Sequence, residues 1–253
     1  MAGNDHNDSK CCFQEWMSLQ EQDLGELVES LTLRANNNVS DEEESLNQLT
    51  EKSIKYFQEY IDKRTELAHK DVSSLFVPTW CSTLENSLLW IAGCKPSAFV
   101  RLVYALCGSQ IESRITEFLQ GVRRGNLGEL TSRQLVMIDN LHGKIIEGEE
   151  ILTTQLASLQ EHIVDQPIAV LSKGLSKVGE ANGEVEQALD QHEKGMVISI
   201  LKEADKLRLG THTELIDILT PVQAVDFLAT SKKLHLNLHQ WGKIRDNKHG
   251  RDI

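Results

Sequence analysis

Prolines, long apolar runs and paired cysteines are all scarce in this sequence. Only four prolines occur among 253 residues, and no stretch alternates apolar and polar residues for long, which argues against a sheet-rich fold. No apolar run approaches the roughly 18 residues of a membrane span. The first twelve residues, MAGNDHNDSKCC, lack the apolar core of a signal peptide. We therefore expect a soluble protein of the cytosol or nucleus.

The cysteines are few and irregularly spaced. Five is an odd number, and no two of them form a Cys-x-x-Cys pair. Disulfide scaffolds and zinc sites both need paired, regularly spaced cysteines, so the pattern predicts neither. Buried or incidental thiols in a reduced compartment are the simpler interpretation. The five are Cys11, Cys12, Cys81, Cys94 and Cys107.

Positive charge is also in short supply. Lys and Arg number 26 against 38 Asp and Glu, which gives a net charge of −12. Non-specific nucleic-acid binding depends on neutralising phosphates, so we expect no direct contact with nucleic acid. Hydrophobic residues make up 40% of the chain, which is too many for a disordered protein. This composition fits a folded protein that approaches other proteins.

What the sequence does contain is helical periodicity, with apolar residues recurring every three or four positions. Three helix starts carry the capping-box pattern, in which a Ser or Thr precedes a Glu or Gln by three residues. These pairs are Ser40 with Glu43, Thr131 with Gln134, and Thr220 with Gln223, the last with Pro221 at the first helical position. The expected helices cover about 13–31, 40–70, 84–92, 96 onward, 131–164, 184–209 and 221–246.

Long helices joined by short loops predict an all-α fold, a single-domain antiparallel helical bundle with several long helices. We expect a flexible N-terminus at 1–11, the helical domain at 12–246 and a flexible tail at 247–253. Signatures of common enzymes are missing: the chain has no Gly-rich phosphate loop, no GxSxG and no HExxH. Glu66 and His69 have the spacing of a two-iron bundle, but no second copy accompanies them. We therefore expect a non-enzymatic protein.

Four stretches carry a resemblance to a known family. They are QEWMSLQ (14–20), PTWCSTLENSLLWIAGCKPSAFVRLVYALCGSQIE (78–112), LTPVQAVDFL (219–228) and KKLHLNLHQWG (232–242). Together they resemble the plant Delay of Germination family, close to its founding member, over about Phe13 to Asp246. The same domain forms the C-terminal region of TGA-type bZIP transcription factors. No basic region or leucine zipper precedes it here, so we expect the DNA-reading part to be absent.

The resemblance implies a regulator of seed dormancy and germination in abscisic acid signalling, located in the nucleus and also in the cytoplasm. It implies that clade A type 2C protein phosphatases are bound and restrained, that haem is a cofactor, and that the chain self-associates. The alternative is a transcription-associated module related to the TGA-type C-terminal domains. The phosphatase-binding segment of the family maps onto Phe13, Glu15, Trp16, Met17, Ser18, Leu19 and Gln20, with a departure at Lys10 to Phe13.

Trp16 has two interpretations. It has the profile of an interface anchor, a large apolar face with an N–H donor. It also shares an apolar stripe with Phe13 and Leu24, as a buried residue would. Both can hold if one side packs while an edge stays exposed.

The family's haem-binding histidines fall on His235 and His239. Side chains at i and i+4 lie about 6 Å apart on one face, whereas the two axial ligands of a haem lie on opposite sides of the ring. Either one histidine ligates and the other assists, or the helix bends, or a second chain contributes; no metal other than haem iron is expected. Leu234, Leu238 and Trp241 could hold the porphyrin, and Lys232, Lys233, Lys243 and Arg245 its propionates.

The same residues also fit an ordinary packed helix with histidines at its polar boundary. The remaining histidines show no comparable pattern. His6 and His249 lie in the expected flexible ends. Surface or boundary positions are expected for His69, His142, His162, His192 and His212.

Overall fold

The structure is a computed structural model that describes residues 2–36, 43–113, 126–162, 164–165, 167–180 and 182–251. Within these residues the chain is helical, and the sole pairing of β type is an isolated bridge between Trp90 and Gly93. The long helices are α1 (Ala2–Asn36), α2 (Glu43–Ala68), α7 (Ser132–His162), α10 (Ile198–Ile218) and α11 (Pro221–Lys248). The shorter ones are α3 (Ser73–Phe76), α4 (Thr83–Leu88), α5 (Ser97–Ser113), the 3-10 turn η1 (Leu127–Glu129), α8 (Ile168–Gly174), α9 (Gly183–Gln191) and the π-helical turn η2 (His192–Val197).

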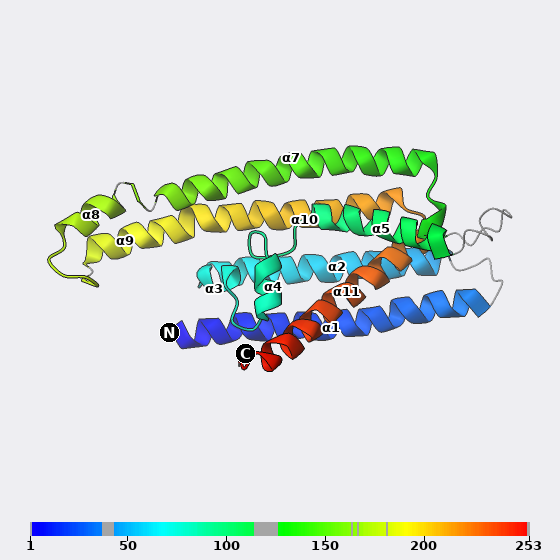
Figure 1. Ribbon diagram of the computed structural model, residues 1–253, viewed down its shortest axis with the longest axis horizontal. Helices are drawn as coiled ribbons and strands as arrows, with labels where there is room; N and C mark the ends of the chain where they lie inside the picture. The colour runs from blue at the N-terminus through cyan, green and yellow to red at the C-terminus, as the bar shows by residue number, and fades with distance from the viewer. Residues whose placement is uncertain are drawn as a thin grey trace.

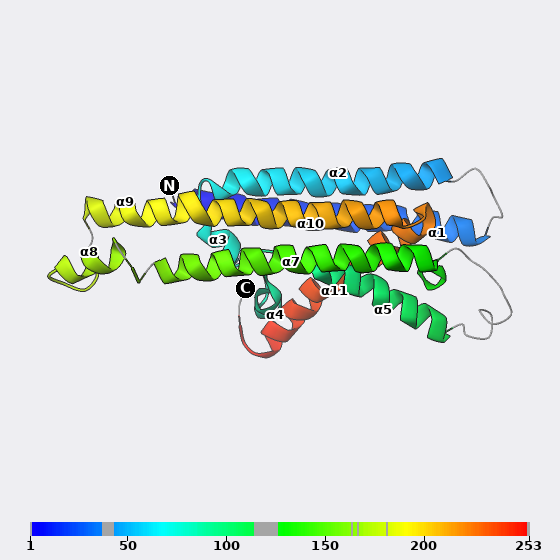
Figure 2. The ribbon, with the colours of Figure 1, turned by 90° about the horizontal axis from the view of Figure 1, so that it is seen from above.

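Helices α1, α2, α7 and α10 run along the long axis; α1 and α10 point in one direction, and α2 and α7 in the opposite one (Figure 1). Helix α11 crosses α1 and α2 obliquely, and its C-terminal part projects from the bundle beside α4 (Figure 2). The predicted all-α antiparallel bundle is confirmed. No helix of the described residues is long and apolar enough to cross a membrane.

Two of the three predicted capping boxes are present. The Thr131 N–H donates to Gln134 Oε1 at 2.9 Å, and the Gln134 N–H donates back to Thr131 Oγ1 at 3.2 Å. The Thr220 and Gln223 pair has the same reciprocal bonds, with Pro221 in the first turn. The third box rests on Ser40, which lies outside the described residues.

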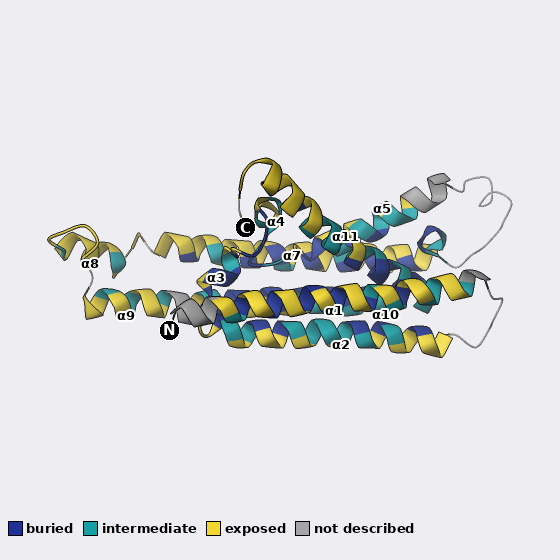
Figure 3. Ribbon diagram, turned by 90° about the horizontal axis from the view of Figure 1, so that it is seen from below, coloured by how far each residue is buried: buried dark blue, intermediate teal, exposed yellow. Residues whose placement is uncertain are grey.

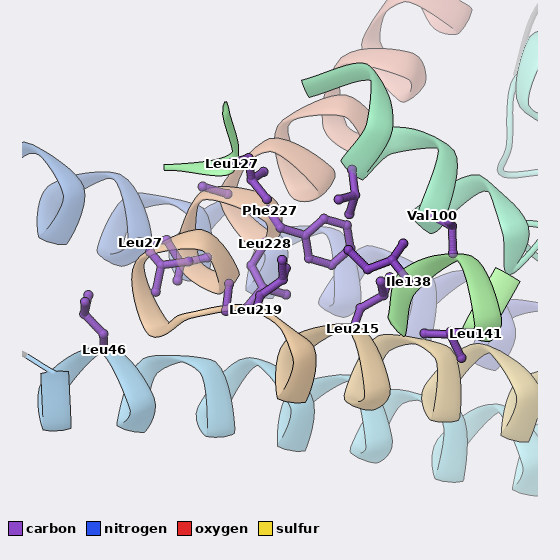
Figure 4. Close-up of a cluster of buried hydrophobic side chains, with 14 of the residues drawn as sticks. Leu27, Leu46, Val100, Leu127, Ile138, Leu141, Leu215, Leu219, Phe227 and Leu228 are labelled. Carbon is purple, nitrogen blue, oxygen red and sulfur yellow. The ribbon is translucent and has the colours of Figure 1, made fainter. Parts of the chain in front are cut away.

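An aliphatic core joins one end of α1 and α2 to α5, α7, α10 and α11. It includes Phe227 and Leu228, both at most 1% exposed. Figure 4 shows these side chains among those of neighbouring helices, such as Ile138 of α7 and Leu215 of α10. We call this group the aliphatic core; its other fully buried members include Leu27, Leu46, Val100, Val103, Leu127, Ile138, Ile145 and Leu215.

Several predicted helix boundaries are wrong; α1, for example, spans Ala2–Asn36 rather than about 13–31. Helix α4 ends at Leu88 rather than at residue 92, because Leu89 is already extended, with a ψ of 135°. Ile91 and Ala92 then adopt positive φ values of 43° and 56°. Carbonyls of this turn accept hydrogen bonds from buried arginines, which stabilise it. Helix α10 passes through Gly210 to Ile218 instead of ending near residue 209.

The ends of the domain stay predictions. Helix α1 begins at Ala2 and α11 ends at Lys248, so both run into the segments expected to be flexible.

Candidate functional site

A cavity of about 450 Å³ opens between α1, α2, α4, α5 and α11. Its wall is mostly aromatic and aliphatic, with charged side chains at a few points. Cavities of this size and lining are typical of small-molecule and cofactor sites, so this is the candidate site. The aromatic and histidine side chains in its wall are Phe13, Trp16, Phe57, Tyr60, Trp80, Phe99, His212 and His235.

The two histidines of residues 232–242 have different surroundings. His235 lines the cavity, where burial lowers the pKa of its imidazole to about 4. Its ring is therefore neutral near pH 7 and keeps a nitrogen lone pair. His239 Nδ1 instead lies 2.8 Å from Glu85 Oε1, and its ring packs edge-on against Phe13 with centroids 5.4 Å apart. His235 thus faces the cavity, while His239 fastens α11 to α4.

Further contacts hold α4 against α11. Glu85 Oε2 accepts hydrogen bonds from the Ser82 N–H at 2.7 Å and the Ser82 hydroxyl at 2.6 Å, which caps the start of α4. Asp246 Oδ2 accepts from the Thr83 N–H at 2.7 Å. Gly242 faces Ser82 so closely that a Cβ there would overlap the Ser82 side chain. We call these contacts the α4–α11 clasp. They hold α11 against α4 and so fix the position of His235 in the cavity wall.

Two buried arginines form one wall of the cavity. Arg208 Nη1 lies 2.6 Å from Asp205 Oδ1, and Arg64 Nη1 lies 3.5 Å from the same oxygen. Their remaining N–H groups donate to backbone carbonyls of residues 90–94. Buried charges need such partners, so the loop at 90–94 and the ionic group stabilise each other.

Lys232 closes the opposite side, between α1 and α11. Its Nζ lies 2.9 Å from Asp23 Oδ2, which also accepts from the Ser53 hydroxyl at 2.6 Å. Burial lowers the pKa of this amine, and the Asp23 carboxylate counteracts that effect. Lys232 also lines the cavity, so its predicted contact with a propionate stays a prediction, for a side chain that already pairs with Asp23.

Only part of the predicted apolar face of α11 borders the cavity. Leu234 and Leu238 line the cavity, whereas Trp241 is 54% exposed and lies beyond it. The cation that sequence reasoning missed is Lys95, a cavity residue whose Nζ lies 3.3 Å from Glu149 Oε2 and whose side chain is half exposed.

The predicted phosphatase segment is a stretch of α1 with an inner and an outer side. Trp16 stacks on Tyr60 with centroids 4.4 Å apart and an interplanar angle of 7°, and also on Phe57 at 5.8 Å. Burial, the second interpretation of Trp16, is what the structure shows. Phe13, Trp16, Met17 and Gln20 are buried, Leu19 is half-buried, and Glu15 and Ser18 are exposed.

The structure brings the two predicted sites together. Phe13, Trp16 and Gln20 line the same cavity as His235, although more than 200 residues separate them in the sequence. Segments predicted separately for a phosphatase and for haem therefore share one wall.

His212 corrects a sequence expectation. It is buried rather than at the surface, with its ring against Phe57, Phe99 and Phe227, and burial lowers its pKa to about 3. Among the described residues, no group of three or more His, Cys, Asp or Glu side chains could hold a metal ion.

Part of the site has a signal in the sequence, a further capping box, which the expected helix at 84–92 does not include. Ser82 and Glu85 have the capping-box spacing, and this box marks the true start of α4. Nothing in the sequence distinguishes Asp205 and Arg208 from a surface pair at i and i+3, so the buried ionic group has no signal of its own.

Comparison with known proteins places this bundle among seed dormancy proteins. The family model "DOG1: Seed dormancy control" matches residues 23–105. The chain is 44% identical to Protein DOG1-like 1 and 41% identical to Protein DOG1-like 3, both of Arabidopsis thaliana. These alignments cover 94% of this chain and 89% and 85% of the two relatives.

A more distant similarity is to Transcription factor TGA2 of Arabidopsis thaliana, at 24% identity over 83% of this chain and 56% of that protein. The chain is thus a helical-bundle protein of the seed dormancy control class. It belongs to the DOG1 family, and this membership implies a role in the regulation of seed dormancy.

Proposed function

We propose that the chain is a non-catalytic regulator of seed dormancy and germination, which binds and restrains clade A type 2C protein phosphatases in abscisic acid signalling and holds haem in the cavity. Family membership supports the role in dormancy. Self-association and a location in the nucleus and cytoplasm belong to the same proposal. The observation that carries the ligand-binding part is the aromatic cavity with the neutral imidazole of His235 in its wall.

For the phosphatase, we propose that the outer side of α1 makes the contact. Glu15 and Ser18 are exposed, and Glu15 pairs with Lys63 at 3.2 Å while both side chains stay largely in solvent. Such a pair contributes at most about 1 kcal/mol, so Glu15 can change partner at little cost. Trp16 then acts indirectly, since its stacking holds the helix that presents both residues.

The test replaces exposed residues and leaves the core intact. Glu15→Lys and Ser18→Arg are each expected to weaken binding to a purified clade A phosphatase at least about tenfold, as measured by titration calorimetry. Glu29→Lys, which is exposed on the same helix, is the matched control. Binding that is equal in all four proteins rejects this contact.

Trp16→Ala is a poor test of the same contact. Removing a buried ring costs about 3–5 kcal/mol, so lost binding would also follow from lost stability. Its melting curve should therefore be recorded beside any binding measurement.

The cavity residues fit haem with one histidine ligand. Haem supplies an iron that accepts a neutral imidazole nitrogen, and His235 offers one in an apolar wall of adequate volume. Lys95 is the half-exposed cation available for a propionate. His239 is held by Glu85, so the geometry favours the arrangement in which one histidine ligates and the other assists.

A Soret-band titration with haemin separates the two histidines. His235→Ala is expected to lose the saturable band, whereas His239→Gln, which can still hydrogen-bond Glu85, should keep it. His142→Ala on α7 is the control, because His142 is half-buried far from the cavity wall. Equal uptake by all variants rejects the site, and loss only in His239→Gln rejects the assignment to His235.

The transcription-associated module remains the alternative, and the similarity to Transcription factor TGA2 favours it. It predicts recruitment to DNA through another protein rather than by this chain. Direct DNA binding that weakens as salt is raised would contradict both versions.

A further inference from the structure

The C-terminal half of α11 exposes apolar side chains that its N-terminal half buries. Residues 224, 225 and 227–229 are all buried in the aliphatic core. Further along, Leu234 is 40% exposed and Trp241 is 54% exposed, with half-buried Leu238 between them. The spacing of i, i+4 and i+7 places these three on one face. We call them the α11 ridge.

The ridge lies on a helix end that projects from the bundle, and much of that end is exposed (Figure 3). Leu88 of α4 is 55% exposed and borders the same cavity as Leu234 and Leu238, so it extends the apolar surface sideways. The α4–α11 clasp lies on another face of α11 and holds the ridge in place. A preformed apolar ridge loses little conformational entropy when a partner covers it.

The charge around the ridge is opposite to that of the rest of the chain. Residues 232–251 contain six Lys and Arg against a single Asp, whereas the whole chain has a net charge of −12. Two of the six are already paired, Lys232 with Asp23 and Arg251 with Asp246, which leaves four cations in this segment. Arg245 and Lys248 follow Trp241 at i+4 and i+7, so they continue the ridge on the same face. Both are exposed, and within the described part of the chain neither forms an ion pair with another residue.

We propose that the α11 ridge, with Arg245 and Lys248, docks an acidic amphipathic helix of a partner protein. Apolar side chains of that helix would cover Leu234, Leu238 and Trp241, while its carboxylates meet the two cations. Helices commonly bind in this way, through anchors at i, i+3, i+4 and i+7. This surface is distinct from Glu15 and Ser18 of the proposed phosphatase contact.

A protein helix fits better than a nucleic acid or a membrane. Leu and Trp side chains gain nothing from phosphates along a ridge of this kind. An anionic membrane or nucleic acid would also bring its charge close to the remaining, strongly acidic part of the chain. A single helix is narrow enough to meet the basic end alone.

The test uses an 18-residue synthetic peptide with Leu at helical spacing of three and four and Glu at the other positions. Trp241 is the most exposed of the four tryptophans, because Trp16 and Trp80 are buried and Trp90 is half-buried. Titration of the full chain with the peptide should therefore shift Trp241 emission to shorter wavelength. A peptide with Lys in place of Glu is the matched control and should bind at least about tenfold more weakly.

Three variants locate the surface. Trp241→Ala and the double change Arg245→Glu with Lys248→Glu should each weaken peptide binding at least about tenfold, as measured by anisotropy of a labelled peptide. Val136→Ala, which lies at an exposed position of α7, should bind like the parent chain. Melting curves confirm that each variant is folded, since all the altered residues are exposed.

Several results would overturn the proposal. Equal binding of the Glu and Lys peptides removes the charge argument, and unchanged binding by both ridge variants removes the site. Binding to vesicles with 30% phosphatidylserine, without binding to the peptide, points to a membrane instead. A dimer of the parent chain that Trp241→Ala converts to a monomer would show that a second copy covers the ridge. None of these results bears on the phosphatase contact at Glu15 and Ser18. Leu234 and Leu238 belong to both the ridge and the cavity wall, so the haem proposal is judged by the Soret titration of the His235 and His239 variants, none of which alters the ridge.

Discussion

The aliphatic core and the cavity wall are two apolar regions of one bundle, and they are built from different side chains. The aliphatic core consists mainly of Leu, Ile and Val around Phe227, and its members interlock. The cavity wall combines flat rings such as Trp16 and Trp80 with the buried charges of Arg64 and Arg208, which Asp205 pairs behind it. Rigid rings and hydrogen-bonded charges cannot adjust to fill a gap as aliphatic chains do. The comparison teaches that a helical bundle gains a cavity where rings and ions replace branched aliphatic residues.

The largest expected effect comes from the ionic part of the cavity wall. Asp205→Ala leaves Arg208 and Arg64 buried without their shared carboxylate, so we expect a loss of about 3–5 kcal/mol in the free energy of unfolding. Urea denaturation measures it. Glu203→Ala is the control, because its pair with Lys206 at 3.8 Å is largely exposed and should contribute under about 1 kcal/mol. Similar losses in both would mean that the charges are not structural.

A pair of leucines on α11 tests the packing difference itself. Leu228→Ala empties a filled site in the aliphatic core and should cost about 2–5 kcal/mol. Leu238 already borders the cavity, so Leu238→Ala should cost about 1 kcal/mol or less, since few contacts are lost. Both values come from the same urea curves. Equal losses would show that the cavity wall is packed as tightly as the aliphatic core.

The effect that is smallest near neutral pH, and grows as pH falls, concerns His212, whose ring touches Phe57 of the cavity wall and Phe227 of the aliphatic core. Its folded pKa of about 3 lies below the ordinary value of 6.5. Between these values the unfolded chain binds a proton and the folded chain does not, so stability falls as pH falls through this window. The slope is up to about 1.4 kcal/mol per pH unit. His212→Phe should flatten the curve of unfolding free energy between pH 7 and 5, and an unchanged slope would contradict this.

The long helices could be predicted from the sequence because the signals at their starts are local. Thr131 with Gln134 and Thr220 with Gln223 contain all the atoms that form the caps, so spacing alone was sufficient. The end of α4 could not be predicted in this way. It depends on Arg208, which reaches the carbonyls of residues 90–94 from more than 110 positions further along the chain.

The candidate site could be predicted only in part. The sequence identified both His235 and Trp16, but not that they share a cavity, because that depends on how α11 crosses α1. Nor could spacing assign different roles to His235 and His239, since both lie on one side of the helix. Glu85, on a separate helix, makes the distinction by bonding His239.

The π-helical turn η2 has a consequence for chain length. It joins α9 to α10 without a break and holds more residues per turn than an α-helix. Such a turn is what remains when one residue is inserted into a continuous helix. Deleting one residue between His192 and Val197 should replace the wide turn by regular α-helix, because the turn holds the extra residue locally, and leave both α9 and the bundle beyond Ile198 in their present orientation. Related chains that differ by one residue here would keep the same bundle and present the same face of α9.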